Sequence, residues 1–155
     1  MKLSAKARYA VRILLDLAIH DANAPIRTAD ISERTGVSAR FIEQILKPLK
    51  KEALVQSTRG ASGGYVLSEK PQDISLARVI RAIEGGLSLT HCCENPESCL
   101  RSETCRSHRA WQRVTWVMEA EFEGISIKDL QDDRILDPRT AASASKSAQS
   151  GNPTR

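Results

Sequence analysis

Three cysteines and one histidine lie close together in the second half of the chain: Cys93, Cys99, Cys105 and His108. Thiolate sulfur binds zinc and iron–sulfur clusters, and imidazole can replace a thiolate as a ligand of either. Paired zinc ligands are typically about two to four residues apart, whereas two of these gaps are five residues long. The spacing leaves an iron–sulfur cluster and a structural zinc ion as open alternatives.

All four cysteines fall between residues 92 and 105, so disulfides among them could not link distant parts of a fold. The amino terminus lacks the apolar stretch and small-residue cleavage site of a secretory signal. No apolar run approaches the length of about eighteen residues that suggests a membrane span. We therefore expect a cytoplasmic protein without membrane association, in which metal binding or redox chemistry is favoured over a disulfide framework.

The residues before the cysteines have the pattern of a helix-turn-helix. A helix is expected at 29–34 with Thr28 as its cap, and Gly36 supplies the turn that follows. Ser38 is the expected cap of the next helix, at 39–51. An earlier helix at 4–20 has apolar residues at helical spacing.

Two short strands are expected after the helix-turn-helix, at 54–58 and 64–67, joined by a glycine-rich tip at 59–64. A hairpin in this position is the wing of a winged helix. The predicted fold is therefore mainly α with a small β-hairpin: a winged helix-turn-helix domain followed by a long dimerisation helix.

Charged and polar side chains form one stripe of the predicted helix at 39–51, opposite its apolar face. Arg40 can donate to guanine, Gln44 can pair with adenine, and Glu43 can accept from the cytosine amino group. Lys47 is better placed to contact phosphates. Residues 1–60 carry eleven Lys and Arg against six Asp and Glu, whereas the rest of the chain carries twelve against thirteen. This asymmetry suggests that the first half binds a polyanion. The predicted DNA-binding residues are Ser38, Arg40, Glu43, Gln44, Lys47 and, at the wing tip, Arg59.

Pro48 lies inside the predicted helix at 39–51. Proline has no N–H to donate to the Gln44 carbonyl, so we expect it to kink or shorten the helix after Lys47. The residues proposed to contact bases precede it.

The second half of the chain is expected to form a helix opened by Ser75, then the cysteine loop, then a long helix at 107–123. One face of the long helix is apolar and has no obvious partner within the chain, so we assign it to a homodimer interface. The domains are predicted as 1–70 for the winged helix, 71–131 for the connecting helix, cysteine loop and dimerisation helix, and 132–155 for a disordered tail.

Five segments together resemble the IscR-type iron–sulfur winged-helix transcription regulators, a superfamily that also includes NsrR, RirA and CymR. The segments are 1–11 (MKLSAKARYAV), 29–36 (ADISERTG), 41–44 (FIEQ), 59–65 (RGASGGY) and the cysteine loop. The resemblance runs from Met1 to about Leu130 and leaves the tail outside.

The resemblance implies a homodimeric transcription factor with a 2Fe–2S cluster, held in IscR-type members by three cysteines and a histidine. Those positions match Cys93, Cys99, Cys105 and His108 here, and Cys92 is extra to the pattern. NsrR relatives use an acidic residue of the first helix, where this chain has Arg8. RirA-type relatives can hold 4Fe–4S clusters with similar cysteines, so 4Fe–4S stays an alternative.

The sequence therefore predicts an iron–sulfur-dependent DNA-binding regulator rather than an enzyme, with double-stranded DNA and a second copy of itself as partners and no small-molecule substrate. Its field of action is expected to be iron–sulfur, iron or redox homeostasis. Two alternatives are a winged-helix regulator with a structural zinc and a redox cluster carrier. The carrier is disfavoured because the chain has no nucleotide-binding fingerprint and no Cys-x-x-Cys pair.

Overall fold

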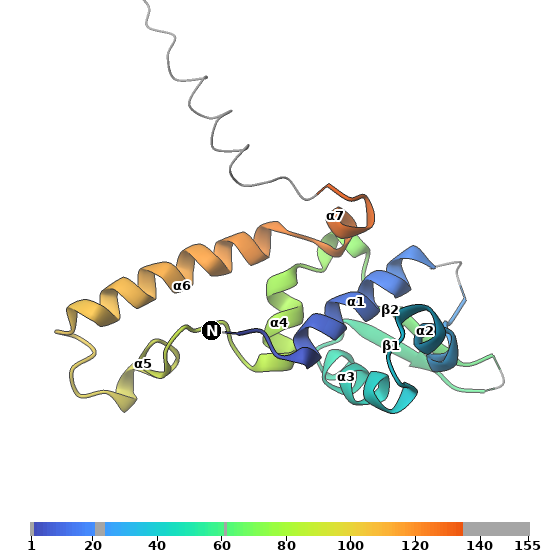
Figure 1. Cartoon of the computed structure of the whole chain (residues 1–155), viewed down its shortest axis with the longest axis horizontal. Helices are drawn as coiled ribbons and strands as arrows, with labels where there is room; N and C mark the ends of the chain where they lie inside the picture. Colours follow the sequence, from blue (N-terminus) through green and yellow to red (C-terminus); the bar gives the residue numbers. More distant parts are fainter. Residues whose placement is uncertain (1, 21–23, 61, 135–155) are drawn as a thin grey trace, which may run out of the picture.

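The computed structural model describes residues 2–20, 24–60 and 62–134, and the predicted tail lies outside it from residue 135 onward. Its elements in chain order are α1 (Ala5–Ile19), α2 (Thr28–Thr35), α3 (Ala39–Lys51), β1 (Val55–Thr58), β2 (Gly64–Leu67), η1 (Pro71–Asp73), α4 (Leu76–Glu84), α5 (His91–Glu94), η2 (Pro96–Ser98), α6 (Arg106–Gly124) and α7 (Ile127–Gln131). The mainly helical fold with one two-stranded hairpin is confirmed (Figure 1).

The long helix α6 extends away from the other helices, and the short α5 lies beside its first turns (Figure 1). Helices α1 to α4, the hairpin and α7 form the opposite end of the molecule. None of the helices in the described ranges is long and apolar enough to cross a membrane.

Helix α1 is the centre of the core. Ala10, Ile13, Leu14 and Leu17 are at most 1% exposed, and α1 contacts α2, α3, α4 and α7. Burying a side chain such as Leu or Ile contributes about 1.5–3 kcal/mol, so this face fixes the positions of the surrounding helices. The Ser4 hydroxyl caps α1 by accepting from the Ala7 N–H at 3.1 Å.

The helix-turn-helix consists of α2, a turn at Gly36 and α3. Gly36 has φ +70°, in the left-handed region that favours glycine. Arg27, rather than the expected Thr28, is the N-cap of α2, because its carbonyl accepts the N–H groups of Asp30 and Ile31. Ser38 is the N-cap of α3 as expected, but through its carbonyl and not its hydroxyl.

Helix α3 continues through Pro48 to Lys51, so the expected shortening at the proline is wrong, while the expected kink stays a prediction. Proline removes only the hydrogen bond to the Gln44 carbonyl. The surrounding turns are held by Ile45, Leu46 and Leu49, which are at most 1% exposed. Their burial outweighs the loss of one backbone hydrogen bond.

The wing is an antiparallel pair in which Val55 is opposite Leu67 and Thr58 is opposite Gly64. Ile26 extends the pair by exchanging backbone hydrogen bonds with Tyr65, at 2.9 and 2.8 Å. Gly64 allows this approach, because a Cβ there would lie 2.4 Å from the Ile26 carbonyl oxygen. The wing is thereby attached to the segment that leads into α2.

Residues on both sides of position 70 share the main core. Ile74, Val79 and Ile127 are buried in the same cluster as the side chains of α1 and α3. A second, smaller cluster is formed by Ala77, Ile80 and Leu87, with Leu3 and Phe122 packed against it. The division at residue 70 stays a prediction.

Candidate DNA-binding surface and metal centre

The polar stripe of α3 faces away from the core. Arg40, Glu43, Gln44 and Lys47 are all exposed. Within the described ranges, none of these four side chains forms a hydrogen bond or an ion pair with the rest of the chain. Their donors and acceptors are therefore available to base edges and phosphates, while the opposite side of α3 is buried.

The wing adds a second exposed surface next to this helix. Arg59 is exposed and directly follows β1. An open cleft between the wing and the amino end of α2 is lined by Arg27, Thr28, Ser57 and Arg59, among other residues. Sequence reasoning identified Arg59 and missed Arg27, because the approach of these segments depends on the Ile26–Tyr65 bridge. Lys50 Nζ donates to Ser57 Oγ at 2.5 Å and so joins the end of α3 to β1.

An ion pair that the sequence did not reveal fixes α2 against α1. Asp16 is buried on α1, and its two carboxylate oxygens accept from Nε and Nη2 of Arg34, both at 2.8 Å. This hydrogen-bonded carboxylate raises the pKa of Arg34 above its ordinary value. His20 lies 3.4 Å from the same carboxylate. Because α2 leads through the turn into α3, the pair helps to orient the helix that carries the DNA-binding stripe.

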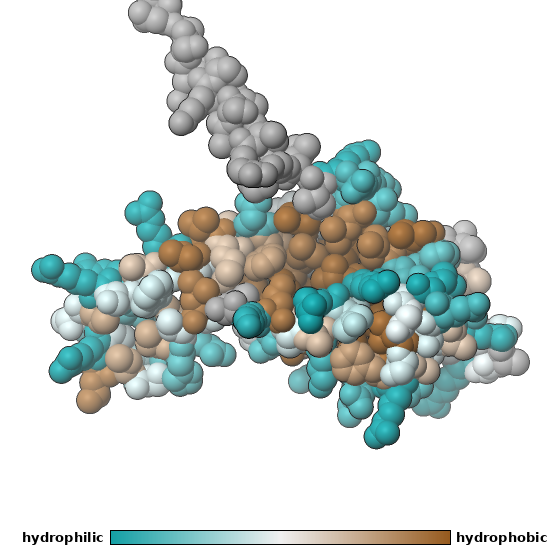
Figure 2. Space-filling model, in the orientation of Figure 1, coloured by the Kyte–Doolittle hydropathy of each residue, from teal (hydrophilic) through white to brown (hydrophobic). Residues whose placement is uncertain are grey.

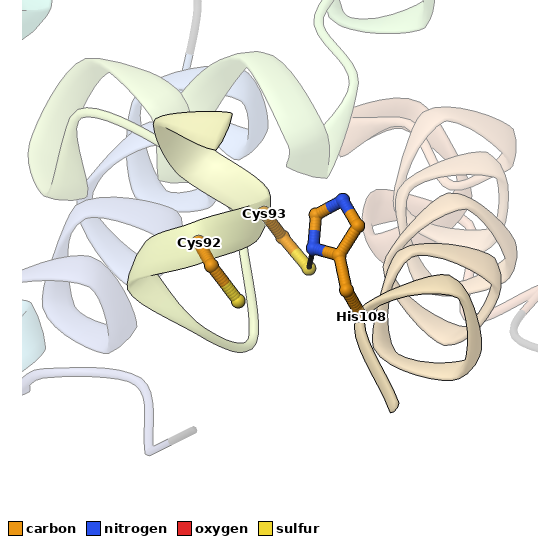
Figure 3. Close-up of side chains that lie close together, drawn as sticks. All are labelled: Cys92, Cys93 and His108. Atoms are coloured by element: carbon orange, nitrogen blue, oxygen red, sulfur yellow. Dashed lines mark hydrogen bonds between the residues drawn. The ribbon is translucent and has the colours of Figure 1, made fainter. Parts of the chain in front are cut away.

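The cysteine loop brings α5 against the first turn of α6. Cys93 Sγ lies 3.9 Å from Nδ1 of His108, whose residue is only 7% exposed (Figure 3). The adjacent Cys92 is also close, and the ligand atoms of Cys92, Cys93 and His108 all lie within 4.8 Å of one another. Two predicted ligands far apart in the sequence are thus neighbours, together with a thiol that the family pattern leaves out.

Thr90 is the N-cap residue of α5, and its hydroxyl lies beside both of these sulfur atoms. Thr90 Oγ1 is 3.1 Å from Cys93 Sγ and 3.3 Å from Cys92 Sγ. A hydroxyl in this place can donate to a thiolate and orient it. Thr90 could not be identified from the sequence, because its contact depends on the local path of the loop.

Cys99 and Cys105 lie further along the same loop. Cys99 is the C-cap of η2, and Cys105 is the N-cap of α6, where its sulfur accepts from the His108 N–H at 3.4 Å. All four cysteines are free and partly buried. Neither Cys99 nor Cys105 belongs to a close group of three or more possible ligands among the described residues.

The donor set fits an iron–sulfur cluster as well as a single soft metal ion. Sulfur and imidazole are the ligands that such groups prefer, and partly exposed thiols leave a route for the metal to enter. A two-iron cluster distributes its ligands over two metal ions, so its four ligand atoms need not all be mutually close. Of the predicted set, the structure brings Cys93 and His108 together and leaves Cys99 apart.

The far end of α6 is connected to α4. Arg81 donates to Glu123 at 2.5 Å and lies 3.4 Å from Glu119. Ser75 also donates to Glu123, at 2.5 Å, and this bond together with that from Arg81 lowers the pKa of Glu123. Because α4 packs against α1 and α3, these contacts link α6 to the helix-turn-helix.

The apolar face of α6 is only partly covered by its own chain. Phe122 packs against the small cluster beneath α4. Trp111, Val114 and Val117 follow one side of the helix and are 47%, 49% and 65% exposed. Hydrophobic residues gather on this view of the molecule from α6 across to α1 (Figure 2). Trp116 is 61% exposed, but it lies on another side of α6, since residues two apart on a helix do not face each other.

A helix-turn-helix with a free polar stripe, followed by a wing, defines a winged-helix DNA-binding protein. The chain belongs to the Rrf2 family, because the family model described as "Iron-dependent Transcriptional regulator" matches residues 3–133.

Individual relatives agree with this assignment. The HTH-type transcriptional regulator IscR of Aliivibrio salmonicida is 39% identical over 133 residues, which cover 86% of this chain and 79% of that protein. The structure of CymR, the global cysteine regulator of B. subtilis, has a TM-score of 0.72 at 30% identity and covers 85% of this chain and 97% of its own. T. potens IscR has a TM-score of 0.69 at 29% identity, covering 99% and 94%. The chain is thus a DNA-binding transcriptional regulator and not an enzyme.

Proposed function

We propose that this protein is a homodimeric regulator whose promoter binding depends on an iron–sulfur cluster, bound by Cys93, Cys99, Cys105 and His108. The observation that carries the proposal is the 3.9 Å approach of Cys93 to the buried His108, which joins α5 to α6. The likeness to IscR regulators and the iron-dependent family description support it. A 2Fe–2S cluster is favoured, and 4Fe–4S is the alternative.

A bound cluster would make the protein sensitive to redox conditions and iron supply, because these change the cluster's oxidation state and integrity. The chain's own residues convert its presence into structure. Ligands from α5, the end of η2 and the start of α6 would order the loop, because Cys105 is the N-cap of α6 and His108 lies in its first turn. Arg81 and Glu123 carry a change in α6 to α4 and so to the helix-turn-helix. This is a coupling between two sites, and it requires two arrangements of α6 with different DNA affinity.

DNA binding is assigned to the two exposed elements of the winged helix. Arg40, Glu43 and Gln44 are proposed to contact base edges. Ser38 is proposed to contact the start of the DNA site, and Lys47 its phosphates. Arg59 is proposed to enter the minor groove, where a narrow groove attracts arginine. The exposed stripe of Trp111, Val114 and Val117 is proposed as the dimer interface. We also propose that the protein acts in the bacterial cytoplasm, where promoter DNA lies.

The full chain, isolated without air, tests the cofactor. We expect a coloured protein with charge-transfer absorption, and an electron-paramagnetic signal on reduction that identifies the cluster type. Binding to a palindromic promoter fragment should change when the cluster is removed. A colourless protein that contains stoichiometric zinc, and that cannot be reconstituted with iron and sulfide even after a chelator has removed the zinc, would instead support the structural-zinc alternative.

Substitution of single cysteines tests the ligand set. Cys99→Ala should abolish the cluster while the protein stays folded, since Cys99 lies outside both hydrophobic clusters. Cys92→Ala is the matched control and should retain the cluster. Full cluster occupancy in Cys99→Ala would contradict the assignment.

A further inference from the structure

Cys92 has no part in the proposed cluster, yet among the described residues it lies in a group of three possible metal ligands whose ligand atoms are all within 4.8 Å of one another. We infer that Cys92, Cys93 and His108 form a second site, which binds one Zn²⁺ ion and excludes the cluster. The exclusion rests on the proposed function, because both sites use Cys93 and His108. The zinc site itself rests on the geometry of the three side chains.

The distances suit a single ion. A tetrahedral zinc site with Zn–S of about 2.3 Å and Zn–N of about 2.0 Å separates its ligand atoms by roughly 3.5–3.8 Å. Cys93 Sγ and His108 Nδ1 are already 3.9 Å apart, and all three ligand atoms lie within 4.8 Å. A contraction of about 1 Å or less would bring them to that spacing. No separate movement of Cys99 or Cys105 is needed.

The chemistry of the group selects a soft divalent ion. Two thiolates and a neutral imidazole cancel a charge of +2, and sulfur ligands favour zinc over magnesium or calcium. Three protein ligands leave a fourth position to water. The Thr90 hydroxyl, 3.1 and 3.3 Å from the two sulfur atoms, is placed to donate to Cys93 and so to orient that thiolate.

The occupancy of this site would report the balance between zinc and cluster supply. Cys93 and His108 cannot serve both groups at once, so zinc on the Cys92 set should block cluster assembly. Cluster assembly additionally requires Cys99 and Cys105, which the structure leaves outside the close group. Cys92 is therefore the residue that distinguishes the two metal states.

Titration of the metal-free full chain with Co²⁺, without air, tests the site directly. Co²⁺ replaces zinc and gives visible bands for tetrahedral geometry and an ultraviolet thiolate-to-metal band. We expect one equivalent to bind with both signals. Cys92→Ser should weaken binding by at least about tenfold and halve the thiolate band. Cys99→Ser is the matched control and should leave both unchanged, and thermal melting should confirm that both variants are folded.

A second measurement separates this inference from the proposed function. Zinc added before iron and sulfide should block cluster assembly in the wild type and fail to block it in Cys92→Ser. Unchanged Co²⁺ binding in Cys92→Ser, or equal weakening in Cys99→Ser, would overturn the zinc site. If Co²⁺ binds as expected but the cluster persists in Cys99→Ser, the zinc site stands and the proposed cluster ligands are overturned.

Discussion

A single side chain at the tip of the wing accounts for a separable part of the proposed DNA affinity. Arg59 is exposed, and its side chain has no partner within the described ranges, so Arg59→Ala should not disturb the fold. Binding should weaken, and the slope of log affinity against log salt should fall by about one, as expected for one lost phosphate-region contact. Fluorescence anisotropy at several salt concentrations measures both. Lys70→Ala, an exposed cation beyond the wing, is the control, and the same slope for Arg59→Ala and wild type would remove Arg59 from the DNA-binding surface.

A buried carboxylate gives the second prediction at this scale. Asp16→Ala should lower the free energy of unfolding by about 1–3 kcal/mol, because it leaves the guanidinium of Arg34 without its two hydrogen bonds. The partial exposure of Arg34 keeps the cost below that of a fully buried pair. Urea denaturation measures it, and Asp30→Ala, on the exposed side of α2, should change stability by much less.

At the metal centre, residue type was predictable and proximity was not. Cys93 and His108 could be chosen because soft ligands at these spacings match a known pattern. Cys92 could not, because two adjacent residues usually point in different directions, and only the four-residue helix α5 brings both sulfur atoms near His108. Asp16 was hidden for a similar reason, since an acidic residue within an amphipathic helix usually faces water.

At the scale of elements, the contact between α4 and α6 is proposed to transmit the state of the loop. Glu123→Gln should weaken it, because the amide cannot form an ion pair with Arg81. The lowered pKa of Glu123 sets the pH dependence. Its carboxylate stabilises the folded state above the pKa of an unfolded glutamate, and the benefit is lost as the pH falls through the lowered value.

Denaturation of wild type and Glu123→Gln across the acid range therefore measures the contact. The difference in stability should be small, since the pair is partly exposed, and should vanish at low pH. Glu121→Gln, an exposed glutamate on the same helix, is the control. A difference that grows as the pH falls would contradict the assigned sign.

Periodic elements were predictable almost to the residue. The expected helix at 39–51 matches α3, because its buried residues repeat at the helical period. The expected strand at 64–67 matches β2, because the glycine-rich tip marks where the hairpin turns. Helix α5 and the turn η2 were missed, since three or four residues are too few to show a period. The expected shortening of the helix at Pro48 was wrong, because the loss of one backbone hydrogen bond is smaller than the gain from burying a whole face of α3.

At the scale of the whole molecule, the proposed homodimer depends on the exposed stripe of α6. Val117→Glu should convert the dimer to a monomer, because it places a charge in an apolar interface. Sedimentation velocity measures the result, and DNA affinity should fall with it, since two linked winged helices bind a palindrome more tightly than one. Trp116→Glu, equally exposed but on another side of α6, should remain dimeric. A monomeric wild type would refute the interface.

Both tryptophans of the chain lie on α6, at positions 111 and 116. Tryptophan fluorescence, excited at a wavelength that tyrosine does not absorb, is therefore a label-free probe of this helix alone. Trp111 belongs to the stripe proposed to become buried, so its emission should shift to shorter wavelength on association, while that of Trp116 stays typical of water. Both residues are within a few turns of His108, so a bound cluster should quench them. One emission spectrum would then follow metal loading and assembly together in unmodified protein.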